Sequence, residues 1–306
     1  MNLTNLKLFV TAVLWGGTFI AGRILAPEID PFSGAFLRFA VSLVVLGPYY
    51  LLTEARHQKN QPGLDAGLTL SILGLGVTGV FGYNFLFLWG LKTVHAGRAA
   101  IIVSGNPAFV VLFSWLLFKE PLNILKITGV VLCLAGAAMV IGRGDPLALF
   151  SGAVTLRDAA IAGAMLTWVA YSLLGKQVMG RITPLAAVTF SCLAGALMLL
   201  PPAMHEGLLA QAARLSLRGW AAIAFLGVFG TALGFVWFYQ GIRKIGASRA
   251  AVFVNFVPVS AAALGALLLN EPINASILTG GTLVLTGVAL ANRGRKQVLP
   301  KGRAVL

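Results

Sequence analysis

The sequence repeats itself after about 150 residues, and this repeat constrains the fold more than any single motif does. With a shift of 151 residues, identities align without a gap from residue 90 to residue 136. They pair Gly90, Arg98, Ala99, Ala100, Pro107, Glu120, Pro121, Asn123, Gly129 and Gly136 with Gly241, Arg249, Ala250, Ala251, Pro258, Glu271, Pro272, Asn274, Gly280 and Gly287. Nearer the N-terminus the shift is 153, which pairs Trp15 with Trp168. A doubled apolar chain is typical of secondary transporters built from two related halves.

The composition indicates that nearly the whole chain lies in a membrane. Of its 306 residues, 58% are hydrophobic and 10% are charged, whereas a soluble domain carries about 25% charged residues. A spanning helix needs about 20 residues, so the sequence predicts ten spans joined by short loops. They are residues 6–25, 31–52, 66–91, 97–118, 123–142, 157–176, 184–204, 218–242, 248–269 and 275–292. We expect an all-α polytopic membrane protein with five-helix repeats at residues 1–150 and 151–306, the second followed by a basic tail.

The distribution of positive charge predicts the orientation. If the N-terminus is cytoplasmic, 15 of the 23 Lys and Arg residues fall on the cytoplasmic side. The positive-inside rule then places both termini in the cytoplasm, as in a bacterial inner-membrane protein. This topology accounts for the net charge of +14 without a nucleic-acid partner. Because each half has an odd number of helices, the second half is expected to be inverted relative to the first, with a cavity between the halves and a rocking motion that opens it to either side.

Two prolines mark the expected midplane of the membrane. Pro107 and Pro258 lie about ten residues into their spans, where each removes a backbone hydrogen bond and exposes the carbonyl of Val103 or Val254. The small polar residues beside them are Ser104, Asn106 and Asn255. One interpretation is a pair of hinges whose freed carbonyls bind a substrate ammonium group. The other is a kink that only improves helix packing.

Aromatic residues supply the candidate binding site, because rings hold an apolar or aromatic substrate while amides and hydroxyls orient its polar ends. The candidate substrate-binding residues are Trp15, Thr18, Phe19, Tyr83, Asn84, Phe87, Ser104, Asn106, Trp168, Tyr171, Ser172, Phe235, Tyr239 and Asn255. The alternative is that such rings face lipid or the membrane interface, which is where we expect Trp115 and Trp220.

The ionisable residues argue against proton coupling. All nine carboxylates lie in predicted loops or at helix ends, whereas a proton relay needs an ionisable residue inside the membrane. Facilitated diffusion is the simpler mechanism. Arg38 lies about seven positions into the second span, where its repeat counterpart is Ser191. It either binds a substrate carboxylate or snorkels to the outer surface, and we expect snorkelling.

The remaining repeated motifs are interpreted as architecture. Glu120-Pro121 and Glu271-Pro272 are expected to end their spans, with each glutamate accepting hydrogen bonds at the start of the following helix. Two further pairs are spaced seven residues apart and therefore share a helix face. They are Gly129 with Gly136, and Gly280 with Gly287. We expect close packing of the fifth and tenth spans in a monomer, the alternative being a dimer interface.

These features resemble the EamA-type drug/metabolite transporter superfamily. The similar points are Trp-Gly-Gly-Thr-Phe at residues 15–19, Arg38-Phe39, the two Glu-Pro turns and the paired glycines. The resemblance implies ten helices in two inverted halves and export of small metabolites; within the superfamily the chain resembles YddG-type exporters of aromatic amino acids.

The predicted function is export of neutral, aromatic and other apolar amino acids, without catalytic residues, cofactor or metal. The alternatives are a multidrug or other metabolite exporter, and a non-transporting membrane sensor or assembly factor.

Overall fold

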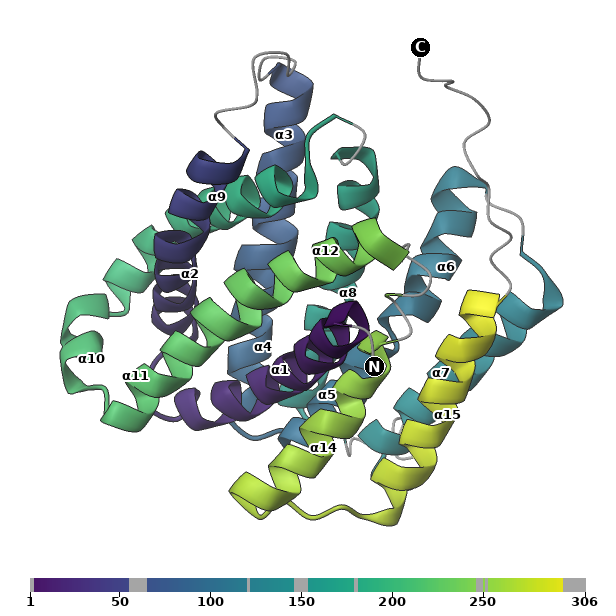
Figure 1. Cartoon of the computed structure of the whole chain (residues 1–306). Coiled ribbons are helices and arrows are strands. Elements are labelled where there is room, and N and C mark those ends of the chain that lie inside the picture. The colour runs from purple at the N-terminus through teal and green to yellow at the C-terminus, as the bar shows by residue number, and fades with distance from the viewer. Residues whose placement is uncertain are drawn as a thin grey trace, which may run out of the picture.

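A computed structural model describes residues 3–54, 65–119, 122–145, 154–178, 181–245, 250 and 253–293, and this part of the chain is helical without strands (Figure 1). The first half contains α1 (Leu3–Leu25), α2 (Pro31–Thr53), α3 (Ala66–Leu75), the π-helical segment η2 (Gly76–Gly82), α4 (Tyr83–Leu91), α5 (Ala96–Ser104), α6 (Asn106–Phe118) and α7 (Ile124–Ile141). The second half contains α8 (Leu156–Val178), α9 (Pro184–His205), α10 (Leu208–Arg214), α11 (Leu217–Ala224), the π-helical segment η4 (Phe225–Leu233), α12 (Gly234–Ile245), α14 (Phe256–Leu269) and α15 (Ala275–Arg293).

The helices have the length and composition of membrane spans. Among the described residues, eight helices are long and apolar enough to cross a membrane, and two shorter apolar helices follow at 256–269 and 275–291. Large apolar side chains such as Leu70, Leu217 and Leu267 point outward and are exposed, as expected of a surface that faces lipid. The chain is therefore an all-helical, multi-pass membrane protein. Each predicted span contains a helix, although part of the ninth lies outside the described residues and the short α10 was not predicted.

The third and eighth predicted spans each contain a π-helical segment, and a shift of 151 residues makes these two segments overlap. A side chain enters the backbone hydrogen-bond ladder in each of them. The Asn84 amide nitrogen donates to the carbonyls of Gly79 (3.2 Å) and Val80 (2.9 Å), and the Thr231 hydroxyl donates to the Leu226 carbonyl (2.9 Å). These bonds satisfy carbonyls in the widened turns. Such π segments are rare and frequently lie at functional sites.

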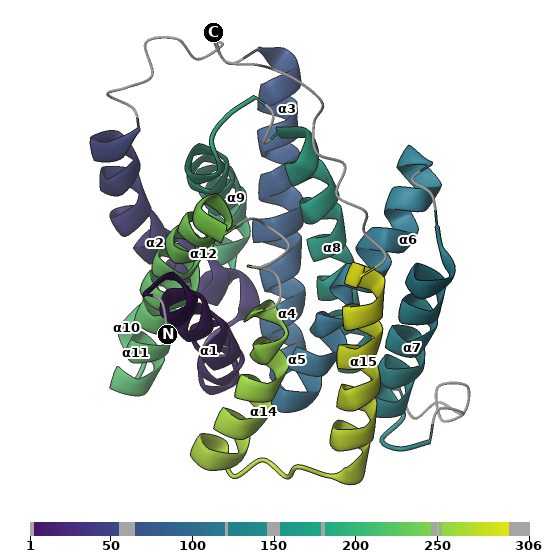
Figure 2. The ribbon, with the colours of Figure 1, turned by 45° about the vertical axis from the view of Figure 1, so that its right-hand side comes forward.

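Repeat-related helices pack against each other in antiparallel pairs. In Figure 2, α7 and α15 lie side by side, and α3 lies above α4 whereas α11 lies below α12. A Cβ atom at Gly129 would lie 2.6 Å from the Gly287 carbonyl oxygen, and one at Gly136 would lie 2.6 Å from that of Gly280. Numbers rise along α7 while they fall along α15, so the two helices are antiparallel. The glycines allow their backbones to approach this closely.

Other helices also pack against helices of the opposite half. Helix α1 packs on α14 and α12, and its counterpart α8 packs on α5, α6 and α4. Helix α2 packs on η4, while its counterpart α9 packs on η2 and also on α2 itself. The largest buried cluster of apolar residues lies where these helices meet. This cluster and a smaller one around Leu68 and Val178 each contain residues of both halves, so neither half has a separate core.

Candidate substrate cavity

A cavity of about 190 Å³ lies among helices of both halves. For scale, an apolar cavity of about 150 Å³ accommodates benzene, so this cavity is of the size of one ring-bearing group. Most of the candidate substrate-binding residues line it. They are Trp15, Thr18, Phe19, Tyr83, Asn84, Ser104, Asn106, Trp168, Tyr171, Phe235 and Asn255, together with Pro107.

Aromatic rings form a connected cluster along the cavity wall. The Trp168 ring centroid lies 5.1 Å from that of Tyr83, 5.0 Å from that of Tyr171 and 6.3 Å from that of Phe235. The Phe235 ring in turn lies 5.6 Å from the ring of Trp15. These separations are typical of favourable aromatic pairs. The cluster therefore offers a preformed surface for an apolar or aromatic group, drawn from both halves of the chain.

A similar close contact occurs at both π segments of the cavity wall. A Cβ atom at Gly79 in η2 would lie 2.2 Å from the ring of Tyr171, and one at Gly230 in η4 would lie 2.6 Å from the side chain of Thr18. Thr18 and Tyr171 are repeat counterparts, as are the two glycines. Each glycine thus lets a cavity-lining residue of the opposite half lie directly against a π segment.

Helix breaks supply the polar part of the wall. Helices α5 and α6 are interrupted at Gly105, and Asn255 occupies the equivalent break before α14. Pro107 is the second residue of α6, where its missing N–H leaves no bond unmade. The Ser104 hydroxyl donates to the Ala100 carbonyl at 2.7 Å. Polar groups therefore gather where the helices stop, as the sequence predicted.

Four predicted site residues do not line the cavity. Phe87 lies one turn beyond Tyr83 and is covered by the rings of Tyr83 and Phe19, at centroid distances of 5.4 and 5.2 Å. The remaining three are held within their own elements: Ser172 donates to the Trp168 carbonyl, Tyr239 packs on Phe235 and Phe238, and Pro258 is buried inside α14. Phe87 therefore packs behind Tyr83, and the sequence did not distinguish residues of the cavity wall from residues packed behind it.

Arg38 lines the cavity, so the expectation that it snorkels was wrong. Its side chain is buried, with 8% exposure for the residue. Its Nη1 donates to Asn84 Oδ1 at 2.6 Å, and its Nε and Nη2 donate to Thr231 Oγ1 at 3.3 and 3.2 Å. These bonds hold the guanidinium inward, between the π segments. The signal available in the sequence was that Arg38 has no basic counterpart at Ser191.

Glu271 also behaves differently from the expectation for its Glu-Pro turn. Its Oε2 accepts a hydrogen bond from the backbone N–H of Ala96 (2.8 Å) at the start of α5, not of the following helix. Its Oε1 lies 3.4 Å from Arg23 Nε and 3.6 Å from His95 Nδ1. The carboxylate therefore joins the α14–α15 turn to the first half. Glu120 and Pro121 lie outside the described residues.

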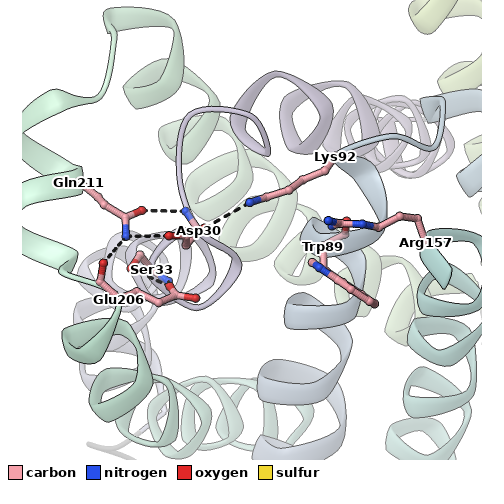
Figure 3. Close-up of polar contacts among 7 residues, drawn as sticks. All are labelled: Asp30, Ser33, Trp89, Lys92, Arg157, Glu206 and Gln211. Carbon is pink, nitrogen blue, oxygen red and sulfur yellow. Dashed lines mark hydrogen bonds and ion pairs between the residues drawn. The ribbon is translucent and has the colours of Figure 1, made fainter.

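Polar contacts, most of them between the halves, cluster at one end of the bundle, here called the Asp30 end (Figure 3). The Asp30 backbone N–H donates to Gln211 Oε1 (2.8 Å), the Gln211 amide donates to Asp30 Oδ2 (3.2 Å), and Lys92 Nζ lies 3.3 Å from Asp30 Oδ1. The Ser33 backbone N–H and hydroxyl both donate to Glu206 Oε2, at 2.9 and 3.0 Å. These bonds tie the start of α2 to the end of α9 and to α10.

Two arginines add further links near this end. The Arg157 guanidinium lies over the Trp89 ring at 4.4 Å and donates to the Trp89 carbonyl (Figure 3). Arg98 Nη2 lies 2.9 Å from a carboxylate oxygen of Asp158, whose side chain is 2% exposed. Each contact joins the first half to the second.

The opposite end of the α2–α9 pair carries the equivalent of the Ser33–Glu206 contact. Glu54 follows α2 and accepts a hydrogen bond from Thr183, the residue that precedes α9. Nearby, Arg181 forms an ion pair with Asp65. The Arg181 guanidinium and then the Leu68 N–H hold the pKa of Asp65 below its ordinary value. The stability that this exposed pair adds is present at pH values above the ordinary pKa of Asp65. It is lost as the pH falls through the lowered pKa of Asp65.

The buried contact of Glu206 predicts a stability effect. Replacing Glu206 by Ala removes the acceptor of the Ser33 N–H and leaves the Ser33 hydroxyl only the Ala203 carbonyl at 3.3 Å, and Ser33 is fully buried. Leaving such donors unpaired costs about 1–3 kcal/mol, so the thermal midpoint in detergent should fall by several degrees. Lys92→Ala is the control, because its ion pair with Asp30 is half exposed and should contribute about 0–1 kcal/mol. Equal midpoints for the two variants would contradict this reading of the contact.

A central cavity, enclosed by helices suited to a bilayer and drawn from two related halves, defines a membrane protein of the transporter class. The EamA-like transporter family model matches residues 2–142 and 156–293. The chain therefore belongs to the EamA-like transporter family.

Full-length relatives support this assignment. The uncharacterized transporter YyaM of Bacillus subtilis is 28% identical over 92% of this chain and 90% of its own length. An uncharacterized transporter of Archaeoglobus fulgidus is 26% identical over 94% of this chain and 98% of its own. A probable terminal-alkyne amino-acid exporter of Streptantibioticus cattleyicolor is 28% identical over 94% and 92%. One solved crystal structure has the same fold, with a TM-score of 0.62 and 21% identity over 94% of this chain and 96% of that one.

Proposed function

We propose that this protein exports neutral amino acids, chiefly aromatic and other apolar ones, across the bacterial inner membrane by alternating access. The observation that carries the proposal is the ring cluster around Trp168, which lines a central cavity of the size of one ring-bearing group. The amides and hydroxyls at the helix breaks suit the polar end of such a substrate. The name of the Streptantibioticus relative, an amino-acid exporter, agrees with this substrate class.

The proposed topology has ten spans in two inverted repeats, residues 1–150 and 151–306. The antiparallel packing of α7 on α15, a helix on its own repeat counterpart, supports the inversion. Lysine and arginine are enriched toward the end that carries Arg181, which favours a cytoplasmic position for that end and for both termini. The Asp30 end then faces outward.

The proposed energetics are facilitative. Of the described residues that line the cavity, none is a carboxylate or a histidine, the groups that most often relay protons in membrane carriers. The substrate then moves down its own gradient. The hinges of this cycle are assigned to the breaks next to Pro107 and Pro258.

Flux measurements in proteoliposomes test the proposal. Vesicles containing the purified protein are loaded with labelled phenylalanine, threonine or a cationic dye, with and without a pH gradient. We expect phenylalanine efflux well above that of protein-free vesicles and unchanged by the pH gradient. Dye efflux driven only by protons, with no phenylalanine efflux, would instead establish a multidrug exporter. Absence of flux for every compound would favour a non-transporting role.

A further inference from the structure

Arg38 is the one charged side chain among the described residues that line the cavity. It projects from the second turn of α2 and is more than nine-tenths buried. Its hydrogen-bond partners, Asn84 and Thr231, are both neutral, and it forms no ion pair with a described residue. A buried charge without a counter-ion is costly, and inside a membrane such a residue usually marks a substrate or ion pathway.

The contacts of Arg38 fix its position but leave donors free. A guanidinium carries five N–H donors. The bonds to Asn84 Oδ1 and Thr231 Oγ1 use three of them, one on each of Nε, Nη1 and Nη2. One N–H on each terminal nitrogen therefore has no partner among the described residues. Two donors on adjacent nitrogens match the two oxygens of a carboxylate, which arginine binds in a bidentate manner.

The neighbours of Arg38 orient it through the π segments. Because the Asn84 amide nitrogen donates to η2 carbonyls, its oxygen must point toward Arg38. Because the Thr231 hydroxyl donates to an η4 carbonyl, its lone pairs remain to accept from Arg38. One acceptor lies in α4 directly after η2 and the other lies within η4, so the two acceptors come from different halves. Asn84 and Thr231 are positioning residues, since they act through Arg38.

The two halves differ at this position of the cavity. The repeat counterpart of Arg38 is Ser191, which also lines the cavity and donates to the Val188 carbonyl of its own helix. One side of an otherwise two-fold cavity is therefore cationic while the other is neutral. A substrate with one anionic end would bind in a single orientation.

We propose that Arg38 binds the carboxylate of the transported substrate, while the ring cluster around Trp168 holds its apolar side chain. The inference rests on the proposed amino-acid export and adds the group that selects acids over amines and alcohols. It also accounts for a cavity that carries a cation and no resident anion: the counter-ion is supplied by the substrate.

Binding of three compounds that share one ring tests this assignment. L-phenylalanine has an ammonium and a carboxylate, L-phenylalaninol lacks the carboxylate, and 3-phenylpropionate lacks the ammonium. Binding to purified protein is followed by tryptophan fluorescence, since Trp15 and Trp168 line the cavity. We expect wild-type protein to bind phenylalanine about 10- to 100-fold more tightly than phenylalaninol, the loss typical of a charged hydrogen-bonded contact.

Variants then assign that preference to Arg38. In Arg38→Gln the two compounds should bind with equal affinity. Arg38→Lys should retain part of the preference, because lysine keeps the positive charge but lacks the paired donors of the planar guanidinium. Ser191→Ala, at the counterpart position, should retain all of it. Thermal unfolding and size-exclusion profiles verify that each variant is folded. If Arg38→Gln is not recovered folded, the wild-type ratio and Arg38→Lys still decide the question.

The outcomes separate this inference from the proposed function. Equal binding of phenylalanine and phenylalaninol by wild-type protein would overturn the role of Arg38 and leave amino-acid export standing. Arg38-dependent binding of 3-phenylpropionate without binding of phenylalanine would uphold the carboxylate site and overturn amino-acid export. Retention of the full preference in folded Arg38→Gln would also reject the inference. Absence of binding for all three compounds would reject both.

Discussion

Replacing Trp168 by alanine is expected to reduce phenylalanine efflux from proteoliposomes by at least about tenfold. The substitution removes aromatic contacts of about 0.5–1.5 kcal/mol each, together with the buried area of the ring. Trp168 contacts Tyr83, Tyr171 and Phe235 at once, so it is the centre of the ring cluster. Its removal opens the wall on which the substrate side chain would rest. Initial rates at several substrate concentrations measure the effect.

Trp220→Ala is the matched control for Trp168→Ala. Trp220 lies in α11, is exposed on the outer surface and does not line the cavity. The same change of residue at this position should leave efflux within about twofold of wild type, as expected for an exposed site away from buried contacts. If folded Trp168→Ala transports as well as Trp220→Ala, the ring cluster is not part of the substrate site.

A second large effect is expected from Gly136→Ala, which adds one methyl group between α7 and α15. The new Cβ atom would lie 2.6 Å from the Gly280 carbonyl oxygen and 2.8 Å from the Val284 backbone nitrogen. Both neighbours are backbone atoms and cannot rotate away, so the helices must separate. Overpacking of this kind costs about 1–3 kcal/mol, or about 4–10 °C in the thermal midpoint. Thermal unfolding in detergent, followed by size exclusion, measures the loss.

Gly47→Ala provides the control for that substitution. Gly47 lies inside α2, and a Cβ atom there would meet nothing within 4 Å. Alanine favours the helix over glycine by about 0.5–1 kcal/mol, so the midpoint should stay the same or rise slightly. Opposite signs for two identical substitutions would locate the cost in the α7–α15 contact. A similar fall in both variants would show that close packing there contributes little.

The sequence was sufficient to predict where the helices lie, because span length and apolar composition are local properties. The paired glycines of α7 and α15 also allowed their packing to be predicted, since a seven-residue spacing fixes a common face. The π segments were not predicted. They depend on how Asn84 and Thr231 reach back to carbonyls of their own helices, and no composition rule distinguishes such residues from other polar residues in a span.

The candidate site was predicted in its composition but not in its electrostatics. Repeated positions such as Trp15 and Trp168 identified the wall. Phe87 was included because it lies in the same helix as Tyr83 and Asn84, whereas the structure packs its ring against those of Tyr83 and Phe19 and outside the cavity lining. Arg38 was expected to snorkel to the outer surface, yet it is buried, and burial of a charge is costly. That cost is offset by acceptors from two distant segments, which a reading of α2 alone does not reveal.

The hydrogen bonds at both ends of the α2–α9 pair restrict how this protein can move. Glu206 accepts a hydrogen bond at the start of α2, and Glu54 accepts one from the residue that precedes α9. The start of each helix is therefore bound to the end of the other, and the two helices belong to different repeats. The packing of α7 on α15 also joins one repeat to the other. A motion that kept each repeat rigid would have to break both the α2–α9 hydrogen bonds and the α7–α15 packing. These contacts predict that any part that moves as a rigid body contains helices from both sequence repeats, so the moving unit is expected to differ from the repeated unit.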